Sequence, residues 1–232
     1  MAPFFVMPPT TPDIKAFYLK QITEAARLRL AAVCKANGIP EVPTSASQLT
    51  LIPVYEDGFK ETLLTLANKL MPTEIIWPQV NQTYVQAYFK RYRKPGARRP
   101  SNQVVIGTSN YCWARLFAAK ELMHCLMDDD DYPASNTVEL VNELIESLSV
   151  AGVIFQDGCT PQTIVDEMAW AGAYKYLIPP DWMPLLLQLQ TDLAQVSTTP
   201  SLHIAQLLRV PDVVVSHVLR HHAVLAQAAE AQ

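Results

Sequence analysis

The order of short strand-like runs and longer helical patterns constrains the fold of this chain most. Three runs of β-branched or aromatic residues fall before a long region of helical character: Glu74–Trp77, Thr83–Phe89 and Gln103–Gly107. Runs of this length and composition predict the strands of a small sheet. A small sheet followed by a series of helices predicts an α+β protein with a mainly helical remainder.

Helical patterns lie on both sides of the predicted sheet. Before it we expect helices from Asp13 to Asn37, ended by Gly38, and from Asp57 to Leu70, with a loop over residues 39–54. After it we expect helices over 112–127, 138–151, 163–177 and 182–196, and two short helices from Ser201 onward. These elements divide the chain into an N-terminal helical region (1–73), a central domain (74–181) and C-terminal helices (182–232).

The composition fits a globular protein. The chain has 232 residues, of which 50% are hydrophobic and 17% charged, and its net charge is −4. Its four cysteines form no C-x-x-C pair, so neither a zinc knuckle nor a disulfide framework is indicated. The first residues lack the pattern of a signal peptide, and no segment has the length of an apolar membrane span. We therefore expect a cytoplasmic protein without membrane contact.

A basic run separates the second and third predicted strands. Six positive charges lie between Lys90 and Arg99, around Pro95 and Gly96. Because the net charge of the chain is negative, any surface for nucleic acid must be local. The run is predicted to be a solvated connecting loop, with contact to an acidic partner or to nucleic acid as the alternative.

The segment Arg115–His124 carries the clearest chemical pattern. Its Lys120, Glu121 and His124 have the spacing of the H-E-x-x-H motif. In that motif two histidines at i and i+4 bind Zn²⁺ and the glutamate polarises a metal-bound water. Lys120 takes the place of the first histidine, and a protonated lysine is a donor rather than a metal ligand. The motif is therefore degenerate.

Three patterns follow one another along the chain. The first is the predicted strand Val104–Ile106 followed by the Arg115–His124 segment, and the second is Asp166–Pro179, an acid-bearing helix that ends at a proline. The third is Ile204–Leu219, a short helix pair built like a helix-turn-helix. Over roughly residues 75 to 225 these patterns resemble the ImmA/IrrE family of metallo-endopeptidases.

The resemblance implies a zincin-like metallopeptidase fold, with 74–181 as the metallopeptidase-like domain and the helix-turn-helix-like pair packed on it. Family members are zinc-dependent proteases that cleave or inactivate repressor proteins, often encoded by mobile elements or acting in stress responses. Carried over to this sequence, the resemblance makes Glu121 the catalytic base and His124 a metal ligand, with Asp166 or Glu167 as an acidic ligand.

Lys120 leaves two interpretations of that site. In the first, its ammonium group occupies the metal position and pairs with Glu121, Asp166 or Glu167, so that a buried salt bridge replaces the cofactor. In the second, zinc still binds with a ligand from elsewhere, because a zinc site needs three protein ligands and a water. The sequence is compatible with zinc and with no cofactor.

A third interpretation uses oxygen ligands. Glu121 and His124 share a helical face at i and i+3, Asp128 extends that face, and Glu143 and Glu146 repeat the spacing on the next predicted helix. Such a site would suit Mn²⁺, Fe²⁺ or Mg²⁺. A solvated stripe of acidic residues is the alternative.

These observations predict a regulatory, ImmA/IrrE-like protein whose catalysis is impaired by Lys120. One alternative is an active endopeptidase that cleaves a repressor-type protein, and a second is a DNA-binding regulator that uses the basic run and the C-terminal helices. In the helix pair, Val213–Val215 favour packing on the domain over base reading. The C-terminal histidines are expected to be solvated rather than metal ligands: His203, His217, His221 and His222.

Overall fold

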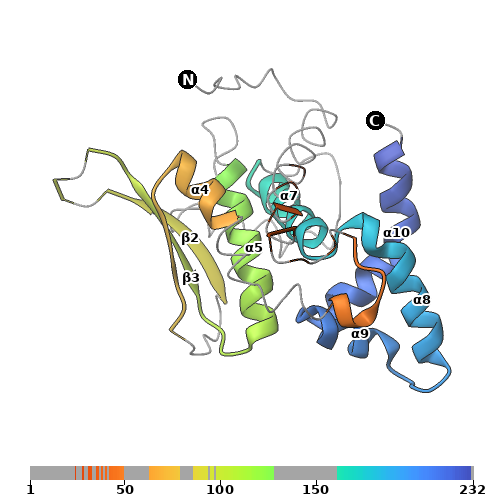
Figure 1. Ribbon diagram of the computed structural model, residues 1–232. Helices are drawn as coiled ribbons and strands as arrows, with labels where there is room; N and C mark the ends of the chain where they lie inside the picture. The colour runs from red at the N-terminus through yellow and green to blue at the C-terminus, as the bar shows by residue number, and fades with distance from the viewer. Residues whose placement is uncertain are drawn as a thin grey trace.

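The computed structural model describes residues 24, 28, 31, 32, 35, 36, 38, 40, 42–49, 63–78, 86–93, 95, 96, 98–127 and 161–230, with backbone only at 161–165, 167 and 223–230. Over these residues the protein is of the α+β class that the sequence predicts, with a three-stranded sheet and a mainly helical remainder (Figure 1).

The sheet has the strand order β1-β3-β2. Strand β1 (Thr73–Ile76) is parallel to the central strand β3 (Ser101–Ile106), and β2 (Ala87–Tyr92) is antiparallel to it. Phe89 and Ile75 both lie opposite Val104, so the three side chains share one face of the sheet. Helix α5 (Tyr111–Met127) packs against β2 and β3 and covers that face.

Strands β1 and β3 lie within a residue or two of their predicted positions, but β2, the second strand along the chain, does not. It was predicted over Thr83–Phe89 and instead runs to Tyr92, so the first residues of the basic run are strand rather than loop. Residues 83–85 lie outside the described residues. Lys90 lies on the outer face of this edge strand, and Arg91 on the other face donates from Nε to Oδ1 of Asn102 at 3.0 Å. Both charged side chains are therefore accommodated without breaking the pairing of the strand.

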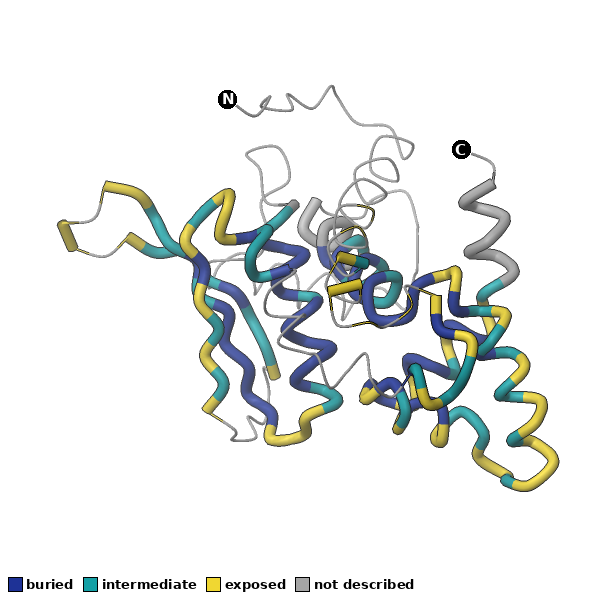
Figure 2. Tube along the Cα trace, in the orientation of Figure 1, coloured by how far each residue is buried: buried dark blue, intermediate teal, exposed yellow. Residues whose placement is uncertain are grey.

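Helix α5 lies between the sheet and α7 (Pro161–Leu177), as Figure 1 shows. Because both sides are covered, α5 is buried nearly all round, and Figure 2 shows buried residues along it and along β3. Ala119 on α5 and Ala169 and Ala173 on α7 are fully buried, and such small side chains let two helices approach closely. Larger residues complete the core on α5: Leu116, Phe117, Leu122 and Met123.

The C-terminal helices lie beyond α7 on the side away from the sheet (Figure 1). A short 3₁₀ helix (Pro180–Trp182) leads into α8 (Met183–Ala194), α9 (Pro200–Leu208) and α10 (Asp212–Glu230), which pack on one another. The last helix has 19 residues, so the prediction of two short helices was wrong for the second. No Gly or Pro interrupts the chain after Asp212, and nothing else in the sequence ends the helix early.

Helices α9 and α10 meet at an angle of 111°, within the range of a helix-turn-helix. Arg209 makes the turn with a left-handed backbone at φ 51°. Within the described residues no single helix is long and apolar enough to span a membrane, and only this bent pair reaches that length and hydropathy when its two parts are joined.

The N-terminal predictions are met in part. Within Asp13–Asn37, residues 24, 28, 31, 32, 35 and 36 are helical, and Gly38 follows at φ 68°, as a helix-ending glycine should. Residues 46–49 form a helical turn inside the predicted loop, where Gln48 Oε1 accepts a hydrogen bond from the Thr44 backbone N–H. Helix α4 (Thr65–Leu70) forms the end of the predicted second helix.

The exposure of Leu70 departs from the helical pattern. Leu63 and Ala67 are buried, but Leu70 is 66% exposed although the seven-residue spacing from Leu63 would place it on the same, inner face of the helix. Leu70 is the last residue of α4, where the chain turns toward β1. The helix predicted over 138–151 lies outside the described residues.

Candidate functional site

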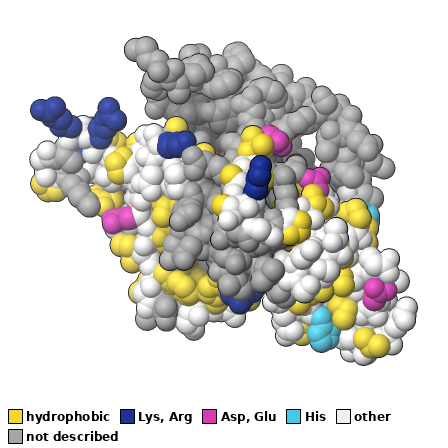
Figure 3. All heavy atoms as spheres, viewed as in Figure 1, with side chains coloured by type: hydrophobic (Ala, Val, Ile, Leu, Met, Phe, Trp, Pro, Cys, Tyr) yellow, Lys and Arg dark blue, Asp and Glu magenta, His cyan; other side chains and the backbone are white. Residues whose placement is uncertain are grey.

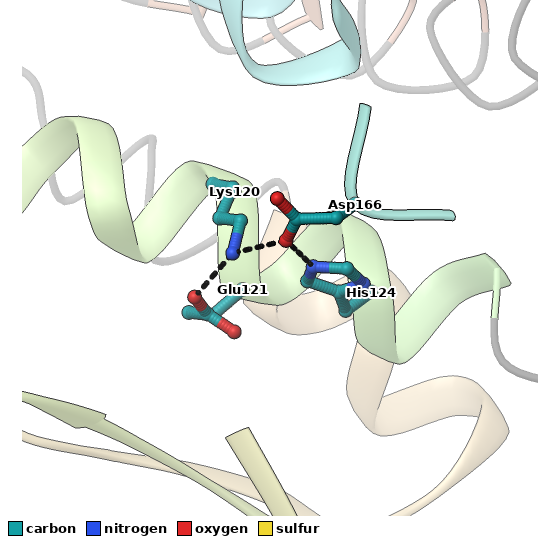
Figure 4. Close-up of polar contacts among 4 residues, drawn as sticks. All are labelled: Lys120, Glu121, His124 and Asp166. Atoms are coloured by element: carbon teal, nitrogen blue, oxygen red, sulfur yellow. Dashed lines mark hydrogen bonds and ion pairs between the residues drawn. The ribbon is translucent and has the colours of Figure 1, made fainter. Parts of the chain in front are cut away.

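Three side chains of the degenerate motif converge within the core. Lys120, Glu121 and His124 come from the buried middle of α5, where Glu121 is 3% and His124 4% exposed. Residues one turn apart on a helix lie on one face, which aligns Lys120 with His124. Figure 4 shows these side chains gathered around Asp166 of α7.

Lys120 connects the two carboxylates. Its Nζ lies 2.6 Å from Oδ1 of Asp166 and donates to Oε1 of Glu121 at 3.1 Å. The Lys120 side chain is 13% exposed, so the ion pairs form in surroundings with little water. The ammonium group is therefore held between an acid of its own helix and an acid of the helix packed against it.

His124 completes the cluster from the other side of Asp166. Its Nε2 lies 3.1 Å from the same Oδ1 atom that accepts from Lys120. The imidazole stacks on Phe89 of β2, with ring centroids 6.3 Å apart and an angle of 18° between the planes. Its buried Nδ1 has no hydrogen-bond partner among the described residues. Phe89 of the sheet thus contacts the face of the ring, and Asp166 of α7 contacts its edge at Nε2.

Trp170 adds an aromatic contact to the lysine. It lies one helical turn after Asp166 on α7, and its ring centroid is 5.5 Å from Lys120 Nζ. A cation over an indole ring is stabilised by about 0.5–2 kcal/mol, depending on its exposure to water. The same helix therefore supplies both a carboxylate and an aromatic face to Lys120.

The cluster favours its charged form. Burial alone would lower the pKa of Lys120, but the attraction of Glu121 and Asp166 outweighs it and raises that pKa above 10.5. Burial likewise opposes ionisation of Asp166, yet the hydrogen bond from His124 and the charge of Lys120 lower its pKa to about 2. Near neutral pH the site is an ammonium–carboxylate pair.

This arrangement does not fit a zinc ion. The site offers one imidazole and two carboxylates, but the Lys120 ammonium lies between the carboxylates at hydrogen-bonding distance and would repel a divalent cation. Among the described residues, no group of three or more His, Cys, Asp or Glu side chains could hold a metal. The salt-bridge interpretation of Lys120 agrees with these distances, whereas zinc binding would require Lys120 to move away from both carboxylates.

Other predicted ligands are not described. The structure gives only the backbone of Glu167, and Asp128, Glu143 and Glu146 lie outside the described residues. The oxygen-rich site therefore stays a prediction, and so does a role for Glu167.

No role was predicted for Arg115, although it begins the motif segment. Its guanidinium donates from Nη1 to the carbonyl of Leu208 and, at 3.4 Å, to that of Arg209. These carbonyls close α9, and a cation at a helix C-terminus is stabilised by the helix dipole. Arg115 is 8% exposed, and the signal that could have revealed it is an arginine flanked by buried apolar residues in a core helix.

Two of the three valines of the helix pair are buried as predicted, and one is not. Val214 and Val215 are buried in the core, while Val213 is 53% exposed. Three of the C-terminal histidines are exposed, as predicted: His203, His217 and His221. The ring of His217 also lies 4.7 Å from that of His221 and 5.7 Å from that of Tyr174, and these contacts were not predicted. Burial lowers the pKa of His217, and electrostatic interactions with His221 and Arg220 lower it further.

Comparisons of the chain with protein-family models, with curated proteins and with solved structures found no match.

Proposed function

We propose that this protein is a non-catalytic, ImmA/IrrE-like regulatory protein with a zincin-like fold, in which a salt bridge replaces the metal. The observation that carries the proposal is the position of Lys120 Nζ, 2.6 Å from Asp166 and 3.1 Å from Glu121. The lysine stands where the first histidine of the motif belongs, and it neutralises the acids that would otherwise need a cation. The fold is maintained while the site for an activated water is lost.

The order of elements supports the same proposal. Strand β3 leads into α5 with the motif, α7 brings an acid to it, and the pair α9 and α10 packs beyond α7. This is the order of the three patterns on which the family resemblance rests. Arg115, the first residue of the motif segment, ties α5 to the end of α9 and so joins two of those patterns.

Activity as a metallo-endopeptidase is the weaker alternative. It would require Lys120 to lose its proton or to leave both carboxylates, yet its pKa is raised by those same groups. Glu121 would also have to be released from the ammonium of Lys120, which donates to its Oε1, before its carboxylate could act on a metal-bound water. We propose that the protein acts in the cytoplasm by binding a repressor-type regulatory protein without cutting it.

Metal content tests the proposal. Protein purified without chelator is expected to contain no stoichiometric zinc by mass spectrometry, whereas Lys120→His should bind about one zinc per chain, because the introduced imidazole, His124 and Asp166 would supply three ligands. Lys69→His, at an exposed lysine of α4, is the matched control and should stay metal-free. Stoichiometric zinc in the unchanged protein would overturn the proposal.

A second test separates binding from cleavage. If the protein regulates by binding, Glu121→Gln should keep its regulatory effect, since the amide can still accept a hydrogen bond from Lys120. A folded Glu121→Gln protein that has lost this effect would indicate a catalytic glutamate.

A further inference from the structure

The basic run and the outer face of the sheet form a surface that the proposed function does not use. Residues 75–120 contain eight basic and no acidic residues, so the rest of the chain holds the other ten of the 18 basic residues and all 22 acidic ones. Lys120 and Arg115 are engaged in the interior. The remaining six belong to the Lys90–Arg99 run. Arg91 donates from Nε to Oδ1 of Asn102, and among the described residues of the run the exposed cations are Arg93, Arg98 and Arg99.

The fold presents this charge on a projecting hairpin. Strands β2 and β3 extend beyond the sheet toward the turn that joins them, and Figure 3 shows Lys and Arg side chains at that end of the molecule. Arg93, Arg98 and Arg99 are exposed, and the turn itself contains Gly96 at φ 79°. The basic run is therefore neither the predicted loop alone nor part of the core.

Aromatic side chains alternate with the charge on β2. Because Phe89 faces α5, its neighbours Tyr88 and Lys90 point to the opposite, outer face of the sheet, as does Tyr92. Lys90 Nζ lies 5.8 Å from the centroid of the Tyr92 ring. Tyr88 and Tyr92 are four strand positions apart, which corresponds to about 13 Å.

The rest of this outer face is largely uncharged. Gln103 of β3 and Glu74 of β1 lie beside Lys90 in register. Glu74 is the one acid on this face among the described residues, and its Oε1 accepts hydrogen bonds from Tyr92 at 2.7 Å and Gln103 at 2.8 Å. Its negative charge is thus partly satisfied within the sheet, and the cations of the hairpin outnumber it.

We propose that the outer face of β2 and the basic hairpin bind single-stranded nucleic acid. Exposed arginines attract the phosphates, while tyrosine rings on a strand offer flat faces on which unpaired bases stack. An acidic peptide would also be attracted by the charge, but it has no bases that stack on the tyrosine rings. In a duplex the faces of the bases are already stacked on neighbouring base pairs, so a single strand fits this surface better.

The test measures binding of the full chain to fluorescein-labelled oligothymidine and oligouridine of about 20 nucleotides, by fluorescence anisotropy at several salt concentrations. The unchanged protein should bind, and its affinity should fall as salt rises. Arg98→Glu combined with Arg99→Glu should weaken binding at least about tenfold and make it less salt-dependent. Arg220→Glu, an exposed charge reversal on α10, should change affinity by less than about twofold and also tests the helix pair as a DNA reader.

Tyr88 separates stacking from charge. Tyr88→Ala should weaken binding roughly tenfold, and Tyr88→Phe should restore it, because the ring and not the hydroxyl contacts a base. A thermal melt of each variant checks folding, and if Tyr88→Ala does not fold, the charge reversals decide. The proposal is overturned by absent binding at about 50 mM salt, by equal loss in Arg220→Glu, by preference for a duplex, or by equally effective competition from polyglutamate.

Discussion

Oδ1 of Asp166 lies 2.6 Å from Nζ of Lys120 and 3.1 Å from Nε2 of His124, so one carboxylate oxygen of α7 joins two residues of α5. The two helices meet through alanines, and their polar contact is concentrated at this point. Removing the side chain of Lys120 or of Asp166 would therefore leave a charged group without its partner in the core.

Replacement of Lys120 by methionine should reduce the free energy of unfolding by about 3–5 kcal/mol, because two buried carboxylates lose their cation. Urea unfolding followed by circular dichroism measures this change. Lys69→Met makes the same substitution at an exposed lysine, and its free energy of unfolding should stay within about 0.5 kcal/mol of that of the unchanged protein. Equal stabilities of the two variants would show that the Lys120 pairs contribute nothing.

Asp166 should make stability depend on acid pH. Its pKa is lowered in the folded protein from 3.8 to about 2, so its contribution is complete above about pH 5 and is lost as the pH falls toward 2. The shift corresponds to about 2 kcal/mol. Asp166→Asn lacks this contribution, so the difference in unfolding free energy between it and the unchanged protein should shrink by that amount between pH 5 and pH 2. Parallel curves would contradict the assignment.

Arg115→Met should loosen the C-terminal helices. The carbonyls of Leu208 and Arg209 lose a charged donor, which is expected to reduce stability by about 1.5–3 kcal/mol. Relative to the unchanged protein, the hydrogen-exchange rate of this variant should increase more in α9 than in β3. Arg220→Met on the exposed face of α10 serves as the control, and exchange that rises equally in both elements would indicate global destabilisation instead.

Arg209→Gly should stabilise the protein by about 1 kcal/mol. Arg209 has a left-handed backbone at φ 51°, which a side chain disfavours and glycine adopts freely. The carbonyl that accepts from Arg115 belongs to the backbone and is kept. Thermal unfolding should give a higher midpoint for Arg209→Gly and a lower one for Arg209→Val, since a β-branched residue suits this conformation least. The reverse order would contradict this account.

Local pattern was sufficient for the elements that surround the site. The predicted 112–127 and 163–177 helices and the Gln103–Gly107 strand match α5, α7 and β3 to within a few residues. The salt bridge of Lys120 was among the predicted alternatives, because the family resemblance puts its ammonium group at the metal position beside Glu121 and Asp166. Asp166 is distant in sequence, and it was named from the resemblance and not from a local pattern.

What the sequence did not reveal depends on distant residues. Arg115 meets Leu208 across 93 positions, and no local pattern names a backbone carbonyl as a partner. The boundary of β2 moved because pairing with β3 outweighed the polar character of Lys90 and Arg91. The aromatic contact of Trp170 with Lys120 likewise follows from the packing of α7 on α5.

The cation in this site is attached to the chain by its own side chain, which has a consequence for the conditions under which the domain folds. A domain stabilised by a dissociable ion gains stability in proportion to the logarithm of the free ion concentration. The ammonium group of Lys120 is part of α5, so it is present beside Asp166 whenever α5 packs on α7. Its effective concentration there is set by the geometry of the chain and does not depend on any free ion. The stability of this core should therefore stay the same in zinc-starved and zinc-rich cells.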